Sequence, residues 1–145
     1  MNNGPEVNSS RTYRIQPPEE GSPIFITITN ATNVDGSIRP HDIFINSKNL
    51  DHYQWMTAIT SLSSMVFKSG TPPEHVSATL QEVFNPAGGY FSQKSYVPSI
   101  VADIGRTIDR HIQETCLQDL AHLDLDKAIN DAQAEHQSTP TQKVS

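Results

Sequence analysis

Two arginines in the second half of the chain have the type and spacing of a phosphate-binding pair. Arg106 and Arg110 are four residues apart, so within a helix both guanidinium groups project from one face. Paired guanidinium groups bind a diphosphate through several charge-assisted hydrogen bonds. The same two residues could instead form weak ion pairs with Asp103 and Asp109 on a solvated surface. The spacing therefore predicts either a phosphate site or an ordinary charged helix face.

The loop FNPAGGYFSQKSYVPS, residues 84–99, is the second candidate for a ligand site. Its adjacent glycines, Gly88 and Gly89, would let a phosphate approach backbone N–H groups, and Tyr90 could stack on a base. Asn85 adds a polar side chain at the start of the loop. The alternative is structural, with the glycines adopting positive φ angles and the aromatic side chains packing over a sheet. The sequence alone is compatible with both interpretations.

The overall charge and composition argue against several functional classes. With a net charge of −6 and an isoelectric point near 5.4, the chain lacks the clustered basic residues that bind duplex nucleic acid. Its single cysteine, Cys116, cannot form an internal disulfide or a four-cysteine metal site, which favours a reducing, cytoplasmic compartment. The six histidines lack metal-ligand spacing, and there is no G-x-S-x-G or P-loop motif. We therefore expect no catalytic residue, no metal and no association with a membrane.

Three segments near the N-terminus have the alternating pattern of β-strands. Residues 23–30, PIFITITN, place isoleucines on one face and Phe25 on the other, and residues 41–46, HDIFIN, repeat this pattern. Residues 12–16 form a weaker third strand. The connecting segment NATNVDGS has the composition of a turn, although its polar side chains could also bind a ribose. Phe25 is a further candidate for stacking on a base.

After the predicted sheet, the apolar residues take the spacing of helices. Apolar residues recur at three- and four-residue steps over residues 50–68, which predicts an amphipathic helix that ends at Ser69-Gly70. In the segment TPPE, Thr71 and Glu74 are predicted to form a capping box at the start of a short second helix. A third helix is predicted to begin at Ser99, because isoleucines then recur every four residues.

Strands followed by helices indicate an α+β fold, with a small antiparallel sheet of about three strands followed by about three helices packed on it. We expect a disordered tail over residues 1–10 and a single domain over residues 11–116. Residues 117–145 are expected to form an acidic helix extension and a second disordered tail. Because so small a sheet has exposed edges and an incompletely covered face, we expect a homo-oligomer, as a dimer or a ring of dimers.

Several motifs resemble a known family. The segments RPHDIFINSKNLDHYQWMTAITSLSSMVFKSG, LQEVFNPAGGYF and YVPSIVADIG are similar to the C-terminal TSCPD domain of adenosylcobalamin-dependent (class II) ribonucleotide reductases. The likeness covers about residues 39–111, half of the chain. It implies a detached accessory or regulatory domain that docks on a reductase large chain and supports deoxynucleotide synthesis. Adenosylcobalamin would then belong to that partner, because this chain is expected to bind no cofactor of its own.

The same resemblance argues against catalysis by this chain alone. The reaction of that family requires a cysteine that forms a thiyl radical and a reducing cysteine pair, whereas this chain has one cysteine. The chain also departs from the family at Ala87, where a basic residue is usual, and at Arg106 and Arg110, where acidic or neutral residues are expected. A charge lost in the loop and a cationic pair gained in the helix indicate a changed ligand or partner.

A more distant resemblance favours a binding function. The order of strands and helices also resembles the small phage-encoded anti-defence proteins of the first Thoeris-inhibitor type, which sequester cyclic ADP-ribose-like immune signals without cleaving them. The preferred hypothesis is a non-catalytic module that captures a phosphorylated, nucleotide-derived small molecule, in the host cytoplasm if a phage encodes the chain. The accessory domain of a ribonucleoside-diphosphate reductase is the alternative. The residues predicted to bind the ligand are Phe25, Asn85, Gly88, Gly89, Tyr90, Arg106 and Arg110.

Overall fold

A three-stranded antiparallel sheet forms the base of the fold. The computed structural model describes residues 6–137. The strands β1 (Glu6–Ile15), β2 (Ile24–Thr32) and β3 (Ile38–Asn46) lie in the order β1-β2-β3, so β2 is central. A single 3₁₀ turn, η1 (Pro18–Glu20), connects β1 to β2. The predicted small antiparallel sheet is therefore confirmed.

The first strand is longer than the sequence predicted. Residues 6–10 were predicted to belong to a disordered tail, but they continue β1 and pair with the end of β2, from Glu6 opposite Thr32 to Ser10 opposite Thr29. That prediction was wrong because it relied on the absence of a regular pattern of apolar residues. An edge strand can be held by its backbone hydrogen bonds alone. Residues 1–5 and 138–145 of the predicted tails lie outside the described residues.

The alternation of side chains along β2 separates a covered face of the sheet from an open face. The side chains of Ile24, Ile26 and Ile28 are fully buried, whereas Phe25 is 40% exposed on the other face. On β3, Phe44 also faces outward and is 57% exposed. The isoleucine face carries the core, and the opposite face has two phenylalanines in contact with solvent.

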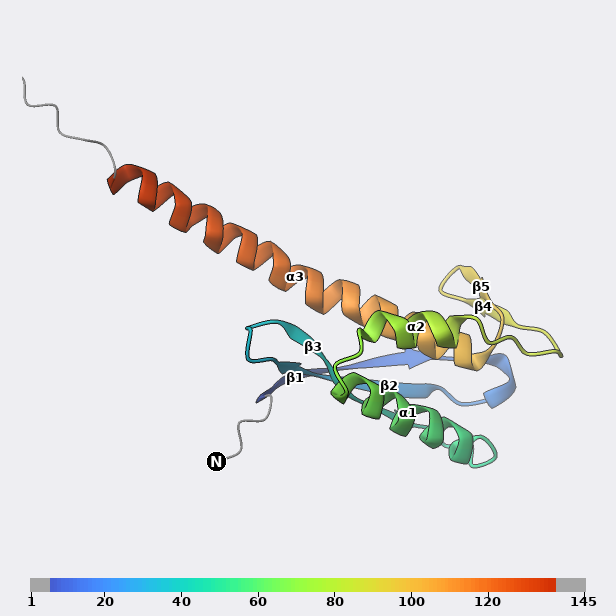
Figure 1. The fold of residues 1–145 in the computed structure, drawn as a ribbon. Coiled ribbons are helices and arrows are strands. Elements are labelled where there is room, and N and C mark those ends of the chain that lie inside the picture. The colour runs from blue at the N-terminus through green and yellow to red at the C-terminus, as the bar shows by residue number, and fades with distance from the viewer. Residues whose placement is uncertain (1–5, 138–145) are drawn as a thin grey trace, which may run out of the picture.

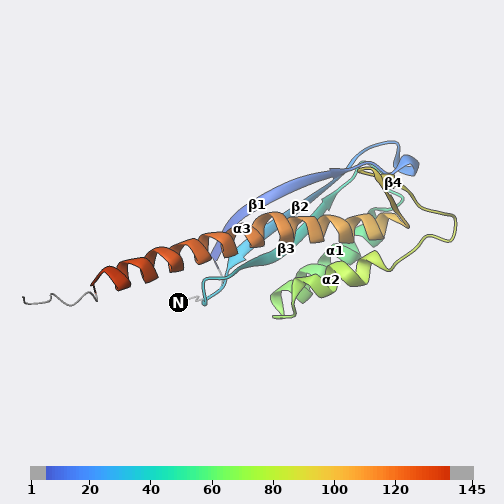
Figure 2. The same cartoon turned by 90° about the horizontal axis from the view of Figure 1, so that it is seen from above.

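Three α-helices follow the sheet, as predicted, and bury its isoleucine face. They are α1 (Tyr53–Lys68), α2 (Pro73–Gln81) and α3 (Ile100–Gln137). Figures 1 and 2 show α3 running along the sheet. Helix α2 packs against α3, and α1 lies beside β3. Their buried apolar side chains join the strand isoleucines in one core, composed of Tyr13, Ile15, Ile24, Ile26, Ile28, Ile43, Met56, Phe67, Val76, Ile104, Ile108, Ile112 and Cys116.

The predicted capping box at the start of α2 does not form. The residue that caps the helix is Pro72, and no side chain hydrogen-bonds the first turn. The Thr71 hydroxyl instead contacts the Ser69 hydroxyl at 3.1 Å. Two consecutive prolines fix the backbone φ angles at the entry, and Pro73 removes one of the N–H groups that a capping side chain would satisfy. The helix start is therefore set by proline and not by a threonine cap.

Helix α1 also covers the outer edge of β3 at Ile43. The Ser64 hydroxyl oxygen lies 3.0 Å from the backbone nitrogen of Ile43 and 3.3 Å from its carbonyl oxygen. It accepts a hydrogen bond from the first group and donates one to the second, so both edge groups of this residue are satisfied. An exposed strand edge is open to pairing with another chain, and a covering helix removes that opening.

The loop predicted over residues 84–99 contains a β-hairpin that the sequence analysis missed. Strands β4 (Tyr90–Ser92) and β5 (Ser95–Val97) pair antiparallel across a two-residue turn. The turn residues Gln93 and Lys94 both have positive φ angles, of 49° and 68°. Such angles are typical of a tight hairpin turn, which usually contains Asn or Gly. The hairpin lies at the N-terminal end of α3 (Figure 1).

Two features fix α3 in place. Gly105 lets α2 approach closely, since a Cβ atom there would lie 2.8 Å from the Leu80 Cβ. Further along, the buried imidazole of His111 contacts Tyr13 Oη through Nδ1 and Asn30 Oδ1 through Nε2, each at 2.8 Å. The amide oxygen accepts, so Nε2 donates and Nδ1 accepts from the tyrosine hydroxyl, which defines a neutral imidazole. This polar triad ties α3 to β1 and β2 through the core.

The C-terminal half of α3 extends past the sheet, as Figures 1 and 2 show. Residues 125–135 are all exposed. Within residues 6–137, no helix is both long and apolar enough to cross a membrane.

Candidate functional site

Arg106 and Arg110 line one cavity on the outer side of α3. The cavity has a volume of about 280 Å³ and lies between α3 and the β4–β5 hairpin. We call it the arginine pocket. Helix positions three and four residues apart share a face, which is why six of the lining residues come from one side of α3. The lining consists of Gln93, Ser95, Asp103, Arg106, Thr107, Asp109, Arg110 and Gln113.

The Arg106 guanidinium fastens the hairpin to α3. Its Nη2 donates to the carbonyl oxygen of Ser92 at 2.6 Å, and its Nη1 donates to the Ser95 hydroxyl. Nη2 also lies 3.9 Å from the Asp103 carboxylate, so this predicted ion pair is present but long. Because several of its donors bind the hairpin, Arg106 both shapes the pocket and presents positive charge to it.

Arg110 is the more available of the two cations. Its Nε donates to Glu114 Oε1 at 2.8 Å, and its guanidinium carbon lies 5.4 Å from the centre of the Tyr13 ring. The predicted partner Asp109 instead accepts a hydrogen bond from Gln113. Among the described residues, the structure gives the two terminal nitrogens of Arg110 no hydrogen-bond partner, and the side chain is 48% exposed. These nitrogens are therefore free to bind an anion.

Glu114 holds Arg110 at this position. Its carboxylate accepts from Arg110 and, through its other oxygen, from Arg11 of β1 at 3.1 Å. The hydrogen bond from Arg110 lowers the pKa of the Glu114 carboxyl, so Glu114 is ionised at neutral pH. The carboxylate fixes Nε and leaves the opposite edge of the guanidinium group facing away from it.

Tyr90 forms part of the support beneath the pocket. Its hydroxyl donates to Asp103 Oδ2 at 2.7 Å, and the Asp103 side chain is only 3% exposed. Burial, together with the hydrogen bond to Asp103, raises the pKa of the Tyr90 hydroxyl, so the tyrosine is neutral and remains a donor. Tyr90 thereby satisfies a buried carboxylate and orients it from the side opposite Arg106.

The structure does not bring the other predicted ligand residues to the arginine pocket. Asn85 stabilises its own turn, since its side-chain oxygen accepts from the Ala87 N–H at 3.0 Å and its carbonyl oxygen accepts from Gly88 N–H at 2.9 Å. The Gly89 N–H donates to the Tyr96 hydroxyl at 2.9 Å. Phe25 lies on the open face of the sheet. The two glycine N–H groups thus have partners within the loop. The structural alternative described above holds only in part, because Gly88 has a positive φ of 105° but Gly89 does not, and Phe91 and Tyr96 are exposed and do not pack over the sheet.

The pocket residues that the sequence analysis missed come from two sources. Thr107 and Gln113 share the α3 face with the arginines, so helical periodicity could have identified them. Gln93 and Ser95 enter from the hairpin, and no local pattern in the sequence places that turn beside α3.

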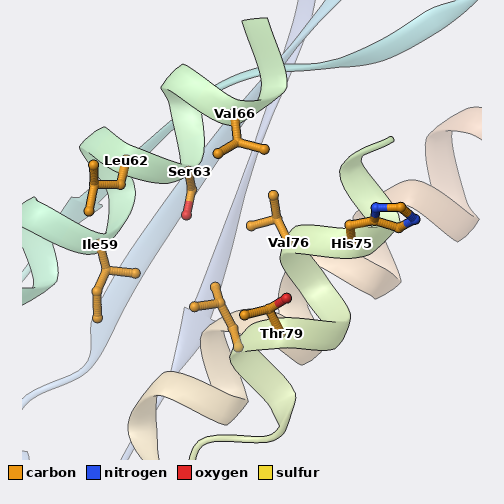
Figure 3. Close-up of a pocket in the computed structure, with 8 residues that line it drawn as sticks. Ile59, Leu62, Ser63, Val66, His75, Val76 and Thr79 are labelled. Atoms are coloured by element: carbon orange, nitrogen blue, oxygen red, sulfur yellow. The ribbon is translucent and has the colours of Figure 1, made fainter. Parts of the chain in front are cut away.

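A second cavity of similar size is unsuited to a charged ligand. It is a groove of about 280 Å³ between α1 and α2, in which Val66 and Val76 face each other across the gap (Figure 3). Most of its lining is aliphatic, and the His75 ring points away from α1. Phosphate recognition needs several donors that converge on one point, and this groove does not supply them.

Comparison with known proteins identifies the family. A family model described as the TSCPD domain matches residues 5–112, well over half of the chain. The comparisons with curated proteins and with solved structures gave no significant match. The matched residues include the whole sheet, α1, α2, the hairpin and the part of α3 that carries both arginines. On this evidence the chain belongs to the TSCPD domain family.

Proposed function

We propose that this protein is a non-catalytic binding module that captures a phosphorylated, nucleotide-derived small molecule at the arginine pocket. The observation that carries this proposal is the placement of Arg106 and Arg110 on one cavity, with the terminal nitrogens of Arg110 free of hydrogen bonds among the described residues. Two guanidinium groups one helical turn apart suit the paired oxygens of a phosphate or diphosphate.

The size of the arginine pocket indicates which part of the ligand it would hold. Small-molecule sites usually have volumes of about 300–1,000 Å³, and the arginine pocket, at about 280 Å³, lies just below that range. It suits the phosphate end of a nucleotide, with the base outside. Gln93, Thr107 and Gln113 add neutral polar groups that could bind the adjoining ribose.

Capture without conversion fits the chemistry of the lining. The pocket contains carboxylates, amides, hydroxyls and guanidinium groups, and Asp103 is already hydrogen-bonded to Tyr90. No cysteine or histidine belongs to its lining. The distant resemblance to Thoeris-inhibitor proteins adds cyclic ADP-ribose-type signals as the ligand class and sequestration as the role.

Thermal shift measurements test this proposal. ADP-ribose and cyclic ADP-ribose isomers are expected to raise the melting temperature, because a ligand that binds only the folded chain stabilises it. Arg110→Gln should abolish the shift. Arg14→Gln is the matched control, because Arg14 is an exposed arginine on β1 outside the pocket. Recovery of intact ligand after heat release would establish that binding is not followed by cleavage.

Arg106→Gln provides a weaker test, since it also frees the hairpin and could act indirectly. An unchanged ligand shift in Arg110→Gln, or no shift with any of these compounds in the wild-type chain, would contradict the proposal.

The second candidate function is an accessory domain of a class II ribonucleotide reductase, and the family match over residues 5–112 is the observation in its favour. In that case the chain would co-purify with a reductase large chain, which would hold the adenosylcobalamin. The isolated chain, with its single cysteine, should form no deoxyribonucleotide. Stable binding to such a large chain without any response to the nucleotides would favour this alternative over the first proposal.

A further inference from the structure

A larger cavity lies at the other end of the sheet from the hairpin. It has a volume of about 460 Å³, compared with about 280 Å³ for the arginine pocket, and the two share no lining residue. It is formed where the β2–β3 turn meets the end of α1 and the start of α2. We call it the turn cavity. Its lining consists of Ala31, Asn33, Asp35, Ser37, Arg39, Pro40, His41, Phe67, Lys68, Gly70, Thr71 and Pro73.

Two cationic side chains meet at the turn cavity although the chain carries a net charge of −6. Two of the ten basic residues, Arg39 and Lys68, line it together with His41. Arg39 lies on β3 and Lys68 ends α1, so the sheet and a helix place the two cations at one site. The two cations can bind an anionic group, although Asp35 in the same lining and the carboxylates of Glu74 and Asp42 beside the cavity offset their charge.

The carboxylates that pair with these cations lie outside the lining of the turn cavity. Arg39 Nη1 is 3.5 Å from Glu74 Oε1, and Lys68 Nζ is 2.7 Å from Asp42 Oδ1. Nearly half of each basic side chain is exposed, at 46% and 47%. Ion pairs this exposed are weak, so either cation can reorient toward a ligand phosphate at little cost. The remaining donors of Arg39 and Lys68 are available without breaking these pairs.

The β2–β3 turn supplies acceptors to the same cavity. Asp35 Oδ1 accepts from the Ser37 N–H at 2.9 Å and from the Ser37 hydroxyl at 2.5 Å, while Asn33 Nδ2 donates to Ser37 Oγ at 3.2 Å. These bonds close the turn, as the structural interpretation of NATNVDGS predicts. Asp35 is exposed and its carboxylate also accepts from its own N–H, but it retains acceptor capacity, and among the described residues no hydrogen bond to Asn33 Oδ1 is seen. Both side chains can accept from the hydroxyls of a ligand.

We propose that the turn cavity binds a sugar phosphate, with the phosphate on Arg39 and Lys68 and the sugar hydroxyls on Asp35 and Asn33. A bare phosphate would meet the Asp35 carboxylate and be repelled, whereas a polyol phosphate donates hydrogen bonds to it. Phe67, Pro40 and Ala31 provide apolar surface for the carbon face of the ring. The cavity volume falls within the range of small-molecule sites. This second site is independent of the arginine pocket.

Isothermal titration calorimetry at low ionic strength tests the turn cavity, with ribose 5-phosphate, inorganic phosphate and ribose as probes. The wild-type chain should bind ribose 5-phosphate more tightly than either of the other two. Arg39→Gln and Lys68→Gln should each weaken its binding by at least about tenfold, as expected for a charge-assisted hydrogen bond. Asp35→Asn should reduce the preference for ribose 5-phosphate over inorganic phosphate, because the repulsion of bare phosphate is removed.

Matched controls separate the turn cavity from general charge effects and from the arginine pocket. Arg14→Gln and Lys48→Gln each remove one exposed cation outside the cavity and should bind ribose 5-phosphate like the wild type. Because the arginine pocket could itself hold a phosphorylated ribose, Arg39→Gln and Lys68→Gln are also compared in the Arg110→Gln background, which should retain the binding at the turn cavity even if it abolishes nucleotide binding. The proposal is overturned if ribose 5-phosphate does not bind, if Arg39→Gln and Lys68→Gln both bind normally in that background, or if Arg110→Gln abolishes the binding.

Discussion

The buried His111 should make folding stability depend on pH between about 4 and 6.5. Burial, reinforced by the positive charge of Arg11, lowers the pKa of the imidazole from 6.5 to about 4, and Glu114 opposes this only in part. The folded chain thus keeps His111 neutral over a range in which the unfolded chain protonates it. Below pH 6.5 the unfolded state binds more protons, so the free energy of unfolding falls as the pH falls toward 4.

The size of this effect follows from the two pKa values. At about 1.4 kcal/mol for each pH unit, the difference between 6.5 and about 4 corresponds to about 3 kcal/mol of stability. That stability is fully present above pH 6.5 and is lost by about pH 4. For a domain with a total stability of about 5–15 kcal/mol, such a loss would be readily measured.

Urea unfolding followed by far-ultraviolet circular dichroism, repeated from about pH 4 to above pH 6.5, would measure this dependence. In His111→Gln the titrating group is absent, so the unfolding free energy should vary less over this range, although Tyr13 and Asn30 lose a partner and the variant is less stable throughout. His75→Gln, which replaces an exposed histidine on α2, should keep the wild-type pH profile. A His111→Gln profile as steep as that of the wild type would refute the reasoning.

Two further substitutions test the supports of α3. Gly105→Ala should lower the urea midpoint, because the added Cβ atom would lie 2.8 Å from the Leu80 Cβ. Such overpacking costs about 1–3 kcal/mol, which exceeds the gain of about 1 kcal/mol in helix propensity. A stabilised variant would contradict the close approach of α2 to α3. Tyr90→Phe should reduce the unfolding free energy by about 1–3 kcal/mol, because Asp103 loses a donor while buried, whereas Tyr53→Phe, at a 46% exposed position, should change it little. Equal stabilities of the two tyrosine variants would show that the hydrogen bond to Asp103 contributes nothing.

Strands and helices with regular spacing of apolar residues could be predicted from the sequence. Elements whose structure depends on contacts with other parts of the chain could not. Alternating isoleucines predicted β2 and β3, and the period of α1 predicted that helix to within a few residues of its start. The hairpin was missed because Gln93 and Lys94 are unusual at positive φ, so the turn has no sequence signature. The predicted capping box was wrong because the preference of threonine for the N-cap position pointed to Thr71, whereas the two following prolines determine where α2 begins.

The candidate site was predictable in the same limited way. The four-residue spacing of Arg106 and Arg110 correctly placed both on one side of a helix. It could not reveal that Arg106 holds the hairpin or that Arg110 is oriented by Glu114, since both contacts depend on how separate elements dock. The composition of NATNVDGS was compatible with hydrogen bonds within a turn and with binding of a ribose, and the structure shows the hydrogen bonds. The cavity beside this turn could not be predicted, because tertiary packing forms it.

The Ser64 hydroxyl on the outer edge of β3 limits how this sheet could grow. A strand donated by another molecule would need the backbone groups of Ile43, and α1 already occupies them. Extension into a continuous intermolecular sheet is therefore hindered at Ile43 on the β3 side and favoured on the β1 side, where Arg11 and Arg14 project from the strand. An assembly built by pairing at the β1 edge would therefore stop at two chains, because each chain would then have used its open edge.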